Sequence, residues 1–89
     1  MVTMYGTPLC KDCVEAVELF SKRGFSNYRY VVITESTENL KAFLRLRDTR
    51  VELCAARAAG SIGVPCFVRE DGTLTLDAGK VLEEAGLAP

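Results

Sequence analysis

The chain has 89 residues, of which 48% are hydrophobic and 26% are charged, and its formal net charge at pH 7 is −1. This length and composition predict one small globular domain over residues 1–89 and argue against disorder and against nucleic acid or an anionic membrane as a partner held by bulk charge. No apolar run is long enough to cross a bilayer and the N-terminal residues lack a signal-peptide pattern, so we expect a cytoplasmic protein.

The counts of cysteine and histidine limit the chemistry that the chain can carry. There are four cysteines and no histidine. The absence of histidine excludes imidazole metal ligands, histidine acid–base catalysis and Cys–His nucleophile pairs. Because the cytosol keeps thiols reduced, we expect the cysteines to be catalytic, metal-binding or buried rather than part of a structural disulfide frame.

The first part of the chain alternates between strand and helix patterns. Residues 1–6 predict a short strand, which Gly6-Thr7-Pro8 ends. From residue 9 or 10, apolar residues recur at intervals of three to four, which is a helical pattern that Gly24 ends. Residues 28–34 are β-branched and aromatic and predict a second strand. Its unbroken apolar run, residues 30–33, is typical of a central strand covered on both faces.

A long helix is predicted after the capping residues 34–38, and it ends near Gly60 with a break or bend around Asp48-Thr49. Four arginines between residues 45 and 57 alternate with acidic residues and are expected to form a solvated face of this helix. One apolar stripe is expected to face the core. It consists of Leu40, Phe43, Leu44, Val51, Cys54, Ala55 and Ala58.

Two strands and a helix complete the chain. Residues 64–68 predict a third strand and residues 73–76 a fourth, joined by a hairpin turn at Asp71-Gly72. Asp77 caps a final helix that Gly86 ends. The order is β-α-β-α-β-β-α. It predicts an α/β fold with a four-stranded mixed sheet and helices on both faces, in which each of the first two β-α-β steps returns a parallel strand.

The reactive chemistry concentrates in Cys10-Lys11-Asp12-Cys13, after the first predicted strand and at the start of the first predicted helix. A helix N-terminus offers free N–H groups and partial positive charge, which favour the thiolate of Cys10. Lys11 adds positive charge, whereas Asp12 opposes it. Cys13 lies one turn further along and is expected to be more buried, which suits a thiol that resolves a mixed disulfide. The alternative interpretation is two ordinary half-buried cysteines.

The Val64-Pro65 step is the second signal. Proline removes a donor from the strand ladder and belongs at the first residue or the edge of a strand. A cis peptide bond before Pro65 would turn the backbone of Val64 outward and leave its N–H and C=O free to pair with an extended thiol substrate. From the local sequence alone, a trans bond is the commoner outcome.

Residues 5–13, the Val64-Pro65 step, the Asp71-Gly72 hairpin and the final helix occur in the order found in glutaredoxins. The chain resembles a small glutaredoxin-related protein with the thioredoxin fold. This resemblance implies a cis bond before Pro65, with Cys10 as the exposed nucleophile and Cys13 as the resolving cysteine. It implies a thiol–disulfide oxidoreductase, acting as a disulfide reductase, that requires no metal or organic cofactor and has glutathione as a candidate co-substrate. Residues expected to contact the substrate are Thr7, Pro8, Lys11, Val64, Pro65 and Asp77.

Three departures from the glutaredoxin pattern bear on the partner. Thr7 stands where the family often has a basic residue, and Gly63 replaces the threonine of its Thr-Val-Pro motif. Thr75-Leu76-Asp77 replaces the Gly-Gly pair and cap that hold the glutamyl end of glutathione. Asp77 offers helix N-terminal amides to a carboxylate, but its own charge repels that group. The expected partners are therefore a protein or small-molecule disulfide and a thiol or reductase as electron donor, with dependence on glutathione left open.

Two further interpretations stay open. Cys10 and Cys13 also suit zinc or an iron–sulfur cluster, alone or across a dimer, although the spacing of Cys54 and Cys66 is not that of a second metal-binding knuckle. The other interpretation is a thioredoxin-fold adaptor with idle cysteines. Cys54 is expected to be a buried structural thiol. Cys66 is expected to be buried in the sheet, with a third redox thiol as its alternative.

Overall fold

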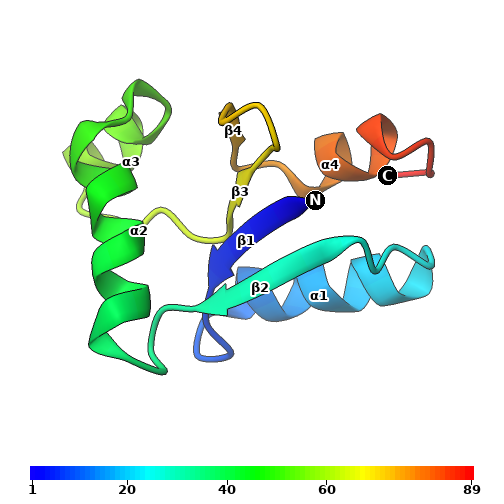
Figure 1. The fold of residues 1–89 in the computed structure, drawn as a ribbon, viewed down its shortest axis with the longest axis horizontal. Coiled ribbons are helices and arrows are strands. Elements are labelled where there is room, and N and C mark those ends of the chain that lie inside the picture. The colour runs from blue at the N-terminus through cyan, green and yellow to red at the C-terminus, as the bar shows by residue number, and fades with distance from the viewer.

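The computed structural model describes residues 1–89, and its elements follow the predicted order, with the long helix divided (Figure 1). None of its helices has the combined length and apolar composition that a membrane crossing requires. In chain order the elements are β1 (Val2–Gly6), α1 (Lys11–Lys22), β2 (Tyr28–Val32), α2 (Thr37–Thr49), the 3₁₀ turn η1 (Val51–Leu53), α3 (Cys54–Ala59), β3 (Cys66–Val68), β4 (Leu74–Thr75) and α4 (Ala78–Glu84).

The four strands form one mixed sheet in the order β2-β1-β3-β4. β1 pairs in parallel with β2, with Met4 opposite Tyr30, while β3 pairs antiparallel with both β1 and β4. β2 therefore lies at an edge, and the prediction of a central strand is wrong. Its run of apolar residues arises because helices cover both of its faces: Tyr30 packs on the α1 side and Ile33 on the α2 side. Coverage of both faces removes the alternation whether or not a strand is central.

The second β-α-β step does not return a parallel strand as predicted. The helical connection breaks at Arg50 into α2 and α3, and the two helices fold back on each other. Arg57 Nη1 donates to the carbonyl oxygens of Arg47 and Arg50, and Arg47 Nε donates to that of Ile62 at 3.0 Å. After α3 the chain enters β3, which runs antiparallel to β1. Of the four arginines expected to form a solvated face, Arg57 thus bonds across the break and Arg47 bonds to the segment before β3.

The break also changes which residues of the long helix reach the core. Phe43 is fully buried, but Val51 is 79% exposed, and Leu53 is buried in its place. Because η1 shifts the phase of the helix, the predicted stripe does not continue into α3, and the predicted burial of Cys54 is wrong. The exposed members of the stripe are Leu40, Leu44, Val51, Cys54, Ala55 and Ala58.

Two apolar clusters, one on each face of the sheet, hold the layers together, and helices cover both faces as predicted. α1 and α4 cover one face, where the buried cluster is Met4, Cys13, Ala16, Phe20, Phe25, Phe67, Val81 and Leu82. α2 and η1 cover the other, where the cluster is Ile33, Phe43, Leu53, Cys66 and Leu74. Successive strand residues point to opposite faces, so Cys66 and Phe67 belong to different clusters.

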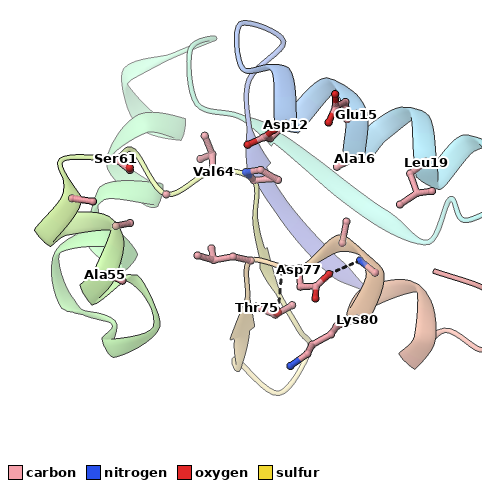
Figure 2. A pocket seen from close by; sticks show the side chains of 17 residues that line it. Asp12, Glu15, Ala16, Leu19, Ala55, Ser61, Val64, Thr75, Asp77 and Lys80 are labelled. Atoms are coloured by element: carbon pink, nitrogen blue, oxygen red, sulfur yellow. Dashed lines mark hydrogen bonds between the residues drawn. The ribbon is translucent and has the colours of Figure 1, made fainter.

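The predicted turn and cap near the C-terminus are confirmed. Asp71 Oδ1 accepts the backbone N–H of Thr73 at 2.9 Å, and Gly72 has a φ of +86°, which an L side chain rarely adopts. Asp77 Oδ1 accepts the backbone N–H of Gly79 at 2.8 Å and begins α4. These local bonds place Asp77 at the end of β4, where the chain turns back toward α1 (Figure 2).

Candidate active site

Cys10 is the N-cap residue of α1. Its Sγ accepts the backbone N–H of Cys13 at 3.4 Å, the bond that a serine or aspartate oxygen usually accepts at this position. The turn that places it there is closed by a hydrogen bond of 3.1 Å from the Cys10 N–H to the Thr7 carbonyl oxygen. The N–H groups of the first helical turn therefore point toward Cys10 Sγ, where they stabilise negative charge. The side chain is also partly exposed, so a reactant can reach the sulfur.

Cys13 lies one turn further along α1 and is fully buried against β1. A Cβ at Gly6 would lie 2.8 Å from Cys13 Sγ, so glycine leaves the space that the sulfur occupies. Burial raises the pKa of the Cys13 thiol to about 12, and a hydrogen bond from the Thr7 backbone opposes this effect. Cys13 is therefore protonated at neutral pH. It is also screened from solvent, whereas Cys10 is partly exposed.

Thr7 is buried, and its side chain orders the turn between β1 and α1. Its hydroxyl lies 2.8 Å from that of Thr34 and accepts the backbone N–H of Leu9 at 3.2 Å. Thr7 was predicted to contact the substrate, and the structure leaves only 4% of it exposed. It acts on the site through its backbone bond to Cys13 instead. The sequence analysis placed Thr34 in the second strand and in the capping segment, but no local pattern pairs it with Thr7, which is 27 residues away.

Val64 and Pro65 lie beside the dithiol, and the peptide bond that joins them is cis. The carbonyl oxygen of Val64 lies 4.0 Å from Cys10 Sγ. No hydrogen bond joins the backbone of Val64 to another backbone group. Its N–H and C=O have no backbone partner, so both can pair with an extended chain whose sulfur approaches Cys10.

A groove with a volume of about 850 Å³ lies between α1, α3, the segment before β3 and the start of α4 (Figure 2). Of the residues predicted to contact substrate, Val64, Pro65 and Asp77 line it, whereas Thr7, Pro8 and Lys11 do not. Pro8 lies exposed in the turn. Lys11 is turned to solvent, with its Nζ 3.9 Å from Glu15 Oε1.

The sequence analysis missed one wall of this groove. Asp12, Glu15, Ala16 and Leu19 line it from α1, and their spacing of three and four residues places them on one helix face. The spacing of these α1 residues could be seen in the sequence, but the residues that face them across the groove could not be identified from it. The residues of this opposite wall come from α3, from the segment after β4 and from α4, which the tertiary fold alone brings together. They include Ala55, Ala56, Ala59, Leu76 and Lys80.

The family model that describes glutaredoxins matches residues 2–67, which include the dithiol and the Val64-Pro65 step. The chain belongs to the glutaredoxin family. An uncharacterized protein of Haemophilus influenzae (strain ATCC 51907 / DSM 11121 / KW20 / Rd) is 35% identical over 72 residues, which cover 81% of this chain and 83% of that protein. No solved structure matches the chain significantly. The predicted α/β, thioredoxin-like fold is confirmed, and membership of the family indicates a thiol–disulfide oxidoreductase kind of function.

The other two cysteines of this glutaredoxin lie away from the dithiol. Cys66 is fully buried as predicted, but on the sheet face opposite Cys13, where burial raises the pKa of its thiol to about 12. It is therefore not placed to act as a third redox thiol with Cys10. Cys54 is exposed on α3. No group of three or more His, Cys, Asp or Glu side chains is arranged to hold a metal ion, so four thiolates do not converge within one chain.

Proposed function

We propose that this protein is a cytosolic disulfide reductase that uses Cys10 as nucleophile and Cys13 as resolving thiol. The contrast between the two sulfurs carries the proposal. Cys10 is partly exposed at the N-cap of α1, whereas Cys13 is fully buried with the pKa of its thiol raised to about 12. One sulfur is thus accessible to a substrate, and the other is protected until the first has reacted.

In the first step the Cys10 thiolate attacks one sulfur of the substrate disulfide, and the other substrate sulfur leaves as a thiolate. The free N–H and C=O of Val64 pair with the substrate backbone beside its cysteine and orient the sulfur toward Cys10. The product is a mixed disulfide between Cys10 and the substrate. No protein proton has moved yet.

In the second step Cys13 loses its proton and attacks Cys10 Sγ. The negative charge of Cys10 and its hydrogen bond to Cys13 contribute to the raised pKa of Cys13, so forming the mixed disulfide removes both contributions. The Thr7 backbone then stabilises the Cys13 thiolate. The Cys10–Cys13 disulfide forms and the second substrate sulfur leaves as a thiolate. The substrate gains two electrons and the dithiol loses both. Of the two protons that the product thiols bind, one replaces the proton that Cys13 released and the other comes from solvent.

An external thiol or a reductase returns the dithiol to its reduced state, and the cycle as proposed uses no metal or organic cofactor. Glutathione remains a candidate donor because the family uses it. Incubating Cys13→Ser with glutathione disulfide tests this directly. A stable Cys10–glutathione adduct would support glutathione as the donor, whereas its absence, with a reversible disulfide in the native protein, would point to a reductase.

The experiment that tests the mechanism compares Cys10→Ser, Cys13→Ser and Cys54→Ser in the reduction of a peptide disulfide. We expect Cys10→Ser to abolish turnover and Cys13→Ser to accumulate a peptide adduct on Cys10, detectable by mass spectrometry. Cys54→Ser, at an exposed cysteine outside the site, is the matched control and should retain full turnover. Full disulfide reductase activity in Cys10→Ser would refute the proposal.

A further inference from the structure

The groove beside the dithiol is acidic. Asp12 and Glu15 contribute carboxylates from α1, and Asp77 contributes one from the opposite wall (Figure 2). Lys80 is the single cationic side chain among the residues that line it. Three carboxylates against one ammonium leave an excess of two negative charges, although the whole chain carries a net charge of only −1. The groove is thus more negative than the chain as a whole, although neither cysteine of the dithiol lines it.

The chain does not neutralise these carboxylates. Asp12 and Asp77 form no ion pair, and Glu15 meets only Lys11, at 3.9 Å and in an exposed position where screening is strong. Asp77 Oδ1 accepts the backbone N–H of Gly79, which is a neutral partner. The side chain of Lys80 extends away from Asp12 and Glu15 (Figure 2). Cationic groups of a ligand therefore have unpaired carboxylates to meet on both walls.

The backbone groups of Val64 favour a polypeptide as the ligand. Val64 presents an N–H and a C=O with no backbone partner, and an extended chain satisfies both at once. Leu76 lines the same groove and is 42% exposed, and Leu9, next to Cys10, is 84% exposed. These apolar side chains are available to the neighbouring residues of such a chain.

We propose that this groove selects polypeptide disulfides with a lysine or arginine close to the reacting cysteine. The proposal rests on the proposed function, because Cys10 must react with the same chain that the groove holds. In an extended chain, a residue two positions from the cysteine lies about 7 Å away. The proposal sets its long basic side chain against the α1 carboxylates on one side or against Asp77 on the other. Glutathione has two carboxylates and one amine, so the same groove disfavours it.

The test uses two peptides, each with one cysteine joined by a disulfide to neutral thiopyridine. One peptide has lysine at the second position before and after the cysteine, and the other has glutamate at the same two positions. Because a flanking lysine also raises the intrinsic reactivity of a disulfide, each rate is divided by the rate with dithiothreitol. We expect kcat/KM to favour the lysine peptide by about tenfold at low salt and the preference to fall toward one at about 0.5 M salt.

Charge variants locate the source of the preference. Asp12→Asn combined with Asp77→Asn, which keeps an oxygen to cap α4, should lower the lysine-to-glutamate ratio several-fold. Lys80→Gln should raise it. Glu18→Gln is the matched control, because it removes one exposed charge from α1 outside the groove and should leave the ratio unchanged.

The outcomes separate this proposal from the one on which it rests. If both peptides are turned over at equal normalised rates, the groove proposal is overturned and the reductase proposal stands. If dithiothreitol reduces both and the protein reduces neither, the reductase proposal itself fails. If Glu18→Gln lowered the lysine-to-glutamate ratio as much as the Asp12→Asn, Asp77→Asn variant does, the preference would arise from net charge and the groove proposal would be overturned. Cystamine, a diamine disulfide with no peptide backbone, should be a poor substrate, and efficient reduction of it would overturn the choice of a polypeptide.

Discussion

Replacing Gly6 with alanine tests whether close packing against β1 sets the position of the resolving sulfur. The new Cβ would lie 2.8 Å from Cys13 Sγ and 3.4 Å from Tyr30 Cε1. The φ of Gly6 is not in the left-handed region, so alanine meets a steric obstacle and no backbone penalty. Overpacking a core typically costs about 1–3 kcal/mol, and the lower entropy of the unfolded alanine chain offsets about 0.4–1 kcal/mol. We expect a net loss of about 1–2 kcal/mol in the free energy of unfolding.

A double-mutant cycle isolates the part of this loss that the sulfur causes. In the Cys13→Ala background the nearest atom left at that residue is its Cβ, 3.4 Å from the new methyl, which is an ordinary contact. Gly6→Ala should then have little effect, and the coupling between the two sites should reach about 1 kcal/mol or more. Urea unfolding of the four reduced proteins, followed by circular dichroism, measures it, with a midpoint shift of about 1 M for Gly6→Ala alone. Equal destabilisation by Gly6→Ala in both backgrounds would refute the reasoning.

Three further predictions concern the buried side chains. Burial raises the thiol pKa of Cys13 and Cys66 from 9.0 to about 12, so their contribution to stability is complete below pH 9 and is lost as the pH rises toward 12. Each thiol should lower the free energy of unfolding by up to about 1.4 kcal/mol per pH unit in that window, and a urea midpoint that does not fall there would contradict this. Iodoacetamide at neutral pH should modify Cys10 and Cys54 in the native protein and all four cysteines in urea; four adducts on the native protein by mass spectrometry would be the contrary result. Phe20→Ala should lower the free energy of unfolding by about 3–5 kcal/mol, because the fully buried ring packs against three other aromatic rings, and a loss below about 1 kcal/mol would count against that packing.

The features that could be predicted from the sequence are those that depend on a few neighbouring residues. The Asp71-Gly72 turn and the Asp77 cap are each made by side chains that bond within two residues along the chain. The position of Cys10 at the start of α1 follows in the same way from the chain-breaking residues before it. The thioredoxin-like architecture then followed from the order of these local elements and from the resemblance to glutaredoxins.

The features that could not be predicted depend on contacts between distant segments. The apolar run of β2 arises because helices cover both faces of the strand. An edge strand and a central strand can both be covered in this way, so the run did not indicate the strand order. A break near Asp48-Thr49 was predicted and lies at Arg50, but the antiparallel direction of β3 was not predicted. The bonds from Arg47 and Arg57 to the carbonyl oxygens of Ile62 and Arg50 join segments that no local pattern relates. The exposure of Cys54 follows from the same break. The 3₁₀ turn η1 interrupts the helix, so the spacing of apolar residues in α2 does not predict which residues of α3 face the core.

The bonds that Arg47 makes link the break in the helix to the substrate side of the molecule. Its guanidinium donates to the carbonyl oxygens of Ser61 and Ile62, immediately before the Gly63-Val64 segment that faces Cys10. An insertion or deletion near Arg50 would therefore move the point at which Val64 meets an incoming chain, with the dithiol itself unchanged. Members of the family that differ in length at this break are expected to diverge in the disulfides they accept, even where their Cys-x-x-Cys segments are identical.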